Sequence, residues 1–353
     1  MIKYNILINN ETYEKTVSYL GNLKTGSSTG KYFQKKLRNV DILQMTPVKF
    51  FELLIETKIP QIFAESAVYG DGTDWNRNEL SILGDINIAV PVTVFDNGKH
   101  YAPSMHEFPF EATLLFTPGA LLRNGRNNIP ADWEEVTVNG EINPEAYYRL
   151  YERRLLPLFM YADEVAGNRG RTAFITVPGL GCGQFAGKFR GRLGSELKNT
   201  LKFFLKKHSS DFSNVRAVYY DPHQECENER HEINGTSFLV RPMTKGNENK
   251  SQLCIPKDYE DYADEFEDCD LFSFVAWDHV SWPGNDFYTG SRSTDDGVKA
   301  AATDAMYMLT GIEGKYDISS NQYNPPSEYK NWQEAVFRNK IRIEVKENFI
   351  IYP

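Results

Sequence analysis

A strand, a glycine-rich loop, a helix and a second strand follow one another between residues 172 and 220. The strands are predicted over residues 172–177 and 215–220, and the helix over residues 190–208, where leucine and phenylalanine recur on one face. Two neighbouring strands joined by a connection of this length require a crossover, so they are expected to run parallel. The sequence therefore predicts an α/β protein with a mixed sheet and helices on both faces, a three-layer α/β/α arrangement.

The loop between that strand and helix reads GLGCGQFAG over residues 179–187. Alternating glycines let backbone N–H groups turn toward one point with no side chain in the way. The loop also precedes a helix N-terminus, where the helix dipole favours a phosphate. We therefore expect it to bind a phosphate group, although a tight turn that only connects the two elements has the same pattern. The spacing and the late position in the chain argue against a nicotinamide-dependent dehydrogenase.

The rest of the chain is predicted to form a helical N-terminal extension over residues 1–80 and one larger domain over residues 81–353. Residues 223–268 are polar, and we expect an insertion or surface loop there. The other predicted strands cover residues 88–95, 111–116, 271–277 and 340–345, and the other main helices cover residues 143–167 and 293–311.

Composition excludes several classes of partner. The chain has 353 residues and a formal net charge of −9, and an acidic surface repels nucleic-acid phosphates and anionic lipids, so neither nucleic acid nor a membrane is an expected partner. The four cysteines form no CxxC pair and lie at no zinc-finger spacing, which favours reduced thiols and a cytoplasmic location. No secretory signal, membrane span, metal site or cofactor is predicted.

Three aspartates follow the predicted strand 271–277. Asp278 comes directly after the strand, Asp286 lies in the loop, and Asp296 lies in the first turn of the next helix. Strand ends in parallel sheets commonly deliver functional groups to a site. A turn cap would also explain Asp286, and the helix dipole would also explain Asp296. His279 is expected to be structural.

The glycine loop with its flanking strand and helix resembles the second ligand loop of macrodomains, which bind ADP-ribose. The strand 111–116 and its TPGALL continuation resemble the earlier macrodomain strand and ligand loop, and GDI at residues 84–86 resembles the motif whose aspartate contacts adenine. The resemblance implies a macrodomain-like fold for residues 81–353. It also implies these ADP-ribose-binding residues: Gly179, Leu180, Gly181, Cys182, Gly183, Gln184, Phe185, Thr117, Gly119 and Asp85.

The spacing of Asp278, Asp286 and Asp296 resembles that of the MavL-like branch of macrodomains, over about residues 80 to 320. That branch contains bacterial effectors that remove ADP-ribose from ubiquitin. The resemblance implies that the three aspartates catalyse removal of mono-ADP-ribose from a protein side chain, with the linked residue (arginine is one candidate) and the target protein (ubiquitin is one candidate) left open. Two alternatives remain, a non-catalytic ADP-ribose reader and an enzyme acting on a nucleotide sugar or phosphate ester. We expect the loop aspartates to be solvated.

Overall fold

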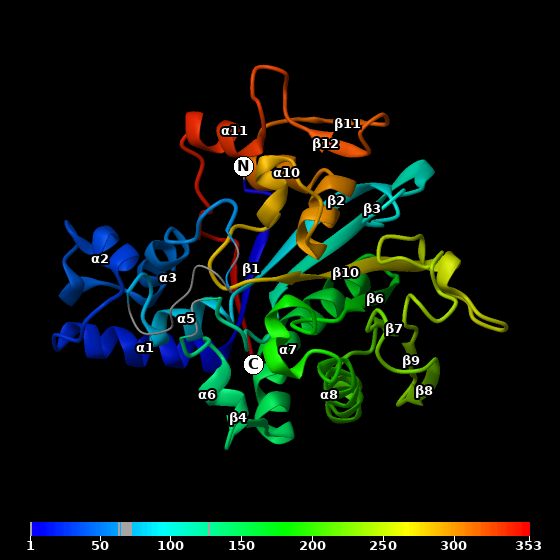
Figure 1. Ribbon diagram of the computed structural model, residues 1–353, viewed down its shortest axis with the longest axis horizontal. Coiled ribbons are helices and arrows are strands. Elements are labelled where there is room, and N and C mark those ends of the chain that lie inside the picture. The colour runs from blue at the N-terminus through cyan, green and yellow to red at the C-terminus, as the bar shows by residue number, and fades with distance from the viewer. Residues whose placement is uncertain (1, 63, 65–72, 126–127) are drawn as a thin grey trace.

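The computed structural model describes residues 2–62, 64, 73–125 and 128–353. Its centre is a nine-stranded mixed sheet (Figure 1). In spatial order the strands are β13 (Phe349–Tyr352), β1 (Asn5–Asn9), β2 (Asn87–Asp96), β3 (Met105–Pro118), β10 (Cys269–Trp277), β6 (Thr172–Pro178), β7 (Val215–Asp221), β9 (Thr236–Val240) and β8 (Glu229–Ile233). Two small hairpins, β4 (Thr137–Val138) with β5 (Glu141–Ile142) and β11 (Lys315–Asp317) with β12 (Gln322–Asn324), lie outside this sheet.

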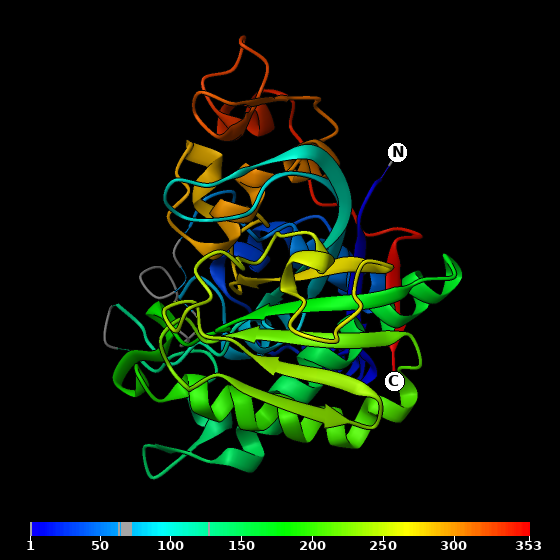
Figure 2. The same ribbon diagram turned by 90° about the vertical axis from the view of Figure 1, so that its right-hand side faces the viewer.

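Helices cover both faces of the sheet, as predicted. The α-helices of the described residues are α1 (Asn10–Lys24), α2 (Lys31–Leu37), α3 (Pro47–Ile55), α5 (Arg77–Leu83), α6 (Trp133–Val136), α7 (Pro144–Asn168), α8 (Leu193–His208), α9 (Asp295–Ala302), α10 (Ala305–Thr310) and α11 (Trp332–Arg338). One hydrophobic core lies under α7 and α8, and the other lies under the N-terminal and C-terminal helices. Figure 2 shows the green helices α7 and α8 along one side of the strands. None of the described helices is long and apolar enough to cross a membrane.

Five neighbouring strands, from β3 through β10, β6 and β7 to β9, run parallel, so their carboxyl ends meet at one edge. Phe174 of β6 pairs with Ala217 of β7, which confirms the predicted parallel arrangement of these two strands. The loops after β3, β10, β6 and β7 therefore lie side by side, and β10 lies between β3, which carries the TPGALL loop (residues 117–122), and β6, which carries the glycine loop. This is the edge at which open α/β sheets bind ligands.

The structure differs from the sequence prediction in four details. The N-terminal segment is not only helical, because β1 joins the main sheet between β13 and β2. Residues 223–268 are not simply a surface loop, because β8 and β9 extend the sheet. Residues 340–345 form no strand, although Ile343 and Val345 are buried as the alternation requires; β13 follows instead. The helix predicted over residues 293–311 is divided into α9 and α10.

The break between α9 and α10 has a long-range cause. Thr303 pairs with Val94 of β2, and the Asp304 carboxylate accepts a hydrogen bond from the backbone N–H of Thr93 at 2.7 Å. These contacts hold the chain in an extended conformation between the helices. The domain boundary predicted at residue 80 remains a prediction, and residues 63 and 65–72 of the proposed extension lie outside the described residues.

Candidate functional site

The TPGALL loop after β3 and the glycine loop after β6 are in direct contact at the carboxyl edge of the sheet. A Cβ atom added to Gly119 would lie 2.3 Å from the backbone nitrogen of Gly181, so only glycine allows this approach. Gly181 also has a φ of +71°, which other residues rarely adopt. The Tyr151 hydroxyl, from α7, links the loops by donating to Leu180 O at 2.7 Å and accepting from Ala120 N at 3.0 Å.

A pocket of about 880 Å³ opens beside the glycine loop. Gly179, Cys182 and Gly183 line it from the loop, and Ala276 lines it from the end of β10. Lys99 and Arg190 bring positive charge to its wall, which also carries the carboxylates of Asp221, Glu225, Glu248 and Asp295. Within the described residues, the backbone N–H of Gly183 has no hydrogen-bond acceptor. A free N–H in a glycine loop, with Lys99 and Arg190 on the same pocket wall, suits a phosphate group.

The other predicted binding residues lie outside this pocket. Leu180 is buried, Gln184 is exposed and accepts from Arg123 Nη1 at 3.0 Å, and the Phe185 carbonyl accepts from the N–H of Leu122 in the other loop at 2.9 Å. Thr117 is buried, and its hydroxyl has no partner among the described residues. Cys182, by contrast, lines the pocket, and burial raises the pKa of its thiol, so this cysteine remains protonated.

The three aspartates are buried, so the expectation that they are solvated is wrong: Asp278, Asp286 and Asp296 are 1%, 3% and 1% exposed. The Asp278 carboxylate closes the turn after β10. It accepts from the backbone N–H groups of Val280 at 2.8 Å and Ser281 at 2.7 Å. Backbone donors of this kind fix both the carboxylate and the turn.

Asp286 fastens the loop to the start of α9. Its Oδ2 accepts from Ser291 Oγ at 2.9 Å, Ser293 N at 2.9 Å and Thr294 N at 3.2 Å. Its Oδ1 accepts from the hydroxyl of Thr294, which in turn caps α9 by accepting from the backbone N–H of Gly297. Asp286 therefore determines where the first turn of α9 lies.

Asp296, in that first turn, differs from the other two aspartates. Its Oδ2 is buried without a hydrogen-bond partner in the described part of the chain. Burial raises the pKa of Asp296 well above its ordinary value, and the charges of Asp278, Asp286 and Asp295 raise it further. The three predicted aspartates are thus close enough to interact electrostatically, and the environment of Asp296 favours its protonated form.

The pocket approaches this cluster at the N-terminus of α9, where Ser293 and Asp295 line it. The Asp295 carboxylate accepts from the N–H of Ala276 at 2.8 Å and from Lys299 Nζ at 3.1 Å. These bonds attach α9 to the end of β10 and keep one carboxylate at the pocket wall. Across the chain ranges described, no group of three or more His, Cys, Asp or Glu side chains could hold a metal ion.

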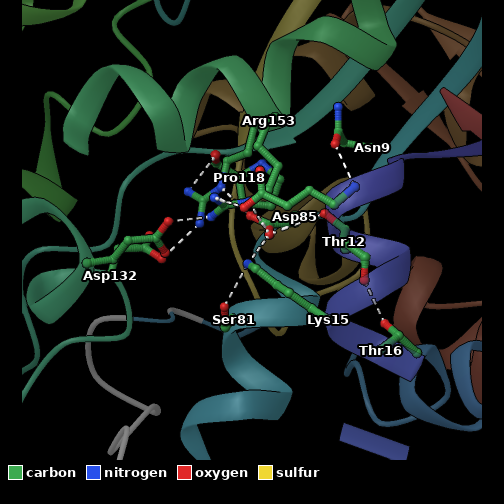
Figure 3. A network of polar contacts seen from close by, with 12 residues as sticks. Asn9, Thr12, Lys15, Thr16, Ser81, Asp85, Pro118, Asp132 and Arg153 are labelled. Atoms are coloured by element: carbon green, nitrogen blue, oxygen red, sulfur yellow. Dashed lines mark hydrogen bonds and ion pairs between the residues drawn. The ribbon is translucent and has the colours of Figure 1, made fainter. Parts of the chain in front are cut away.

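Asp85, which the resemblance implies as the adenine contact, lies in a network of ion pairs. It is fully buried, and its carboxylate accepts from Lys15 Nζ at 2.6 Å, Arg153 Nε at 2.7 Å and Arg154 Nε at 3.1 Å (Figure 3). These cations hold the pKa of Asp85 well below its usual range against the effect of burial. An adenine could reach this carboxylate only by displacing an ion pair, so Asp85 is a structural residue in this arrangement.

The same network supports the first glycine loop. Arg154 donates to Pro118 O at 3.2 Å and to Asp132 Oδ1 at 2.8 Å, and Asp132 Oδ2 accepts from the N–H of Leu121 at 2.8 Å. His279, next to Asp278, is fully buried, and its Nε2 lies 3.3 Å from Asp132 Oδ1. One set of charges therefore orients both the loop after β3 and the turn after β10.

Lys58, from the N-terminal region, contacts the turn that follows β10. Its Nζ donates to His279 O at 2.6 Å and lies 4.0 Å from the centre of the Trp277 ring. Burial lowers the pKa of Lys58 to about 7, and the charge of Asp278 opposes this shift. The next residue, Ile59, pairs with Ser281 in a short parallel bridge. The N-terminal region thus supports the loop that carries the aspartates.

Comparison with known proteins agrees with this arrangement. Residues 4–329 match the family described as macrodomain effector MavL. The chain belongs to this macrodomain family. No curated protein matches it significantly.

The match begins within the N-terminal region, whereas the resemblance in the sequence begins near residue 80. This agrees with the contacts that β1 and Lys58 make with the rest of the macrodomain. Macrodomains bind ADP-ribose, and the pocket beside the glycine loop is suited to its diphosphate. Sequence reasoning missed Lys58, Arg154 and Asp132, because their partners lie far away in the chain.

Proposed function

We propose that this macrodomain is an ADP-ribosyl hydrolase that removes mono-ADP-ribose from a modified protein side chain. The observation that carries the proposal is the asymmetry among the aspartates. Asp278 and Asp286 accept several hydrogen bonds each, whereas Asp296 has an unpartnered oxygen and a raised pKa. Carboxyl groups whose environments differ in this way are suited to divide acid and base roles.

The reaction breaks the bond between C1 of the distal ribose and the linked side-chain atom. Asp296 in its protonated form donates its proton to the leaving atom, and the nearby carboxylates stabilise the positive charge that develops on the ribose. Water adds its hydroxyl group to C1, and its remaining proton returns to the carboxylate of Asp296. ADP-ribose and the unmodified side chain leave, and the acid is restored.

The charges around the site also bear on the substrate. Lys99 and Arg190 line the pocket and would attract the diphosphate, and Asp295 at the pocket wall would attract a guanidinium leaving group. We therefore propose an arginine-linked adduct as the first substrate to test, with ubiquitin, the candidate that the resemblance in the sequence implies, as the first target protein. Such a protein would act in a cytoplasm, that of a host cell if it is a secreted effector.

The test is release of ADP-ribose from mono-ADP-ribosylated proteins carrying arginine, acidic or serine linkages, with calorimetric binding of free ADP-ribose alongside. Turnover of at least one linkage supports the hydrolase. Binding without turnover of any linkage would instead identify a reader module, which the glycine loops support equally well. Absence of both binding and turnover would contradict both functions.

A further inference from the structure

A buried amide in the pocket wall has no partner. Gln252 is 5% exposed and lines the pocket, and neither its Nε2 nor its Oε1 forms a hydrogen bond with any described residue. Its backbone is fixed, because Gln252 O accepts from Thr176 Oγ1 at 3.1 Å and the following N–H, of Leu253, donates to Asn97 O at 3.3 Å. A buried amide that satisfies neither its donor nor its acceptor costs folding free energy, and this points to a ligand that supplies both partners.

A carboxylate lies beside this amide. Asp221, at the end of β7, is 6% exposed and lines the same pocket. Its Oδ1 accepts from the backbone N–H groups of His223 and Met243, both at 2.8 Å. Burial raises the pKa of Asp221, and the Gln252 side chain opposes this shift as a hydrogen-bond donor would, although no atom of that side chain meets the distance and angle of a hydrogen bond with a described residue. The wall therefore presents one amide NH₂ group as donor and two kinds of oxygen acceptor.

We propose that Gln252 and Asp221 recognise the adenine base of ADP-ribose, an inference that rests on the proposed function. The exocyclic amino group of adenine donates to the two oxygens, and the neighbouring ring nitrogen accepts from Gln252 Nε2, the pairing by which glutamine recognises adenine elsewhere. Pro178, Pro222 and Met243 also line the pocket and offer apolar surface for the faces of the ring. Asp85 is occupied by its three cations, so the adenine needs another recognition site.

The first test changes the nucleobase of the ligand from adenine to hypoxanthine. Hypoxanthine carries a carbonyl oxygen where adenine carries its amino group, and this oxygen would face the Asp221 carboxylate. By calorimetry, the parent protein should bind ADP-ribose at least about 10-fold more tightly than inosine diphosphate ribose, which is about 1.4 kcal/mol. Equal affinities for the two ligands would overturn the inference, and this measurement needs no variant.

The second test is Gln252→Leu, which keeps the size of the side chain and removes the amide. It should weaken ADP-ribose binding about 10-fold, weaken binding of inosine diphosphate ribose by a smaller factor, and raise the melting temperature of the free protein. Gln44→Leu is the matched control, because Gln44 is exposed and lies away from the pocket, and it should change none of these.

The outcomes separate two failures. If the parent does not bind ADP-ribose, the proposed function fails and this subsite fails with it. If the parent binds ADP-ribose but Gln252→Leu binds it equally well, only the subsite is overturned. A Gln252→Leu protein that melts at a lower temperature and binds both ligands more weakly would show that Gln252 is structural, which also overturns the assignment.

Discussion

Replacing Asp296 with asparagine should have opposite effects on activity and stability. Asparagine has the same shape, cannot donate a carboxyl proton and carries no charge. General acid–base groups typically contribute about 10²–10⁴-fold to a rate, so Asp296→Asn should slow ADP-ribose release by that factor while binding of free ADP-ribose changes little. Because the carboxyl group is buried beside three other aspartates, the same change should stabilise the fold at neutral pH.

The size of that stabilisation depends on pH. An aspartate in the unfolded chain titrates near pH ~3.9, and the pKa of Asp296 in the folded protein is raised well above this. Between these two values the folded state holds a proton that the unfolded state has lost, so this carboxyl group lowers the free energy of unfolding by about 1.4 kcal/mol per pH unit. Its stabilising contribution is complete below the unfolded pKa and is lost as pH rises through the folded pKa.

Urea unfolding of the parent and Asp296→Asn across a pH series measures this difference directly. The two proteins should be nearly equally stable near pH 4, and the advantage of the variant should grow as pH rises. An advantage that is independent of pH, or a variant that is less stable than the parent at neutral pH, would refute a protonated Asp296. Parent-like turnover by the variant would remove Asp296 from the mechanism.

Three further predictions concern the surroundings of the site. Asp286→Ala should lower the free energy of unfolding by about 2–4 kcal/mol, because it leaves several donors around a buried carboxylate unpaired. Asp317→Ala, at the end of β11, removes a carboxylate with comparable but solvent-exposed bonds and should have little effect in the same urea titration. Arg154→Met should lower the free energy of unfolding by about 3–5 kcal/mol, because two buried carboxylates, Asp85 and Asp132, lose a cation. The pKa of Asp132 is lowered in the folded protein, so the stability that its ion pair with Arg154 contributes is present above the unfolded pKa and is lost as pH falls through the folded pKa. A pH series of thermal melts of the parent and the variant measures this loss. Gly181→Val should reduce both the melting temperature and ADP-ribose affinity, and an unchanged melting temperature would contradict the close contact between the loops.

The central unit of the fold was predictable because its signals are local. The buried strand, the glycine loop and the helix between residues 172 and 208 each follow from side chains a few positions apart. Edge and terminal elements were not predictable in this way. β8 alternates exposed and half-buried positions, so its polar sequence resembles a loop. Ile343 and Val345 alternate as a strand would, yet they enter the core without strand pairing.

The site was predictable in its residue types and less so in their environments. Asp85 stands in a motif that suggests a ligand contact, but Arg153 and Arg154 reach it from positions 68 and 69 residues later in the chain. The sequence carries no sign of that approach. Gln252 was missed for the complementary reason, because an unpaired amide is recognised only when every neighbour is known.

The aspartate spacing alone cannot tell which carboxyl group moves a proton, but the hydrogen bonds distinguish the three. Asp286 holds Ser293 and Thr294 at the start of α9, and this same turn carries Asp296. An Asp286 substitution can therefore reduce turnover by displacing Asp296 without taking part in the chemistry. A substitution of Asp286 should reduce both turnover and stability, whereas Asp296→Asn should reduce turnover and raise stability. Measuring turnover and stability for both variants therefore separates the residue that positions the acid from the acid itself.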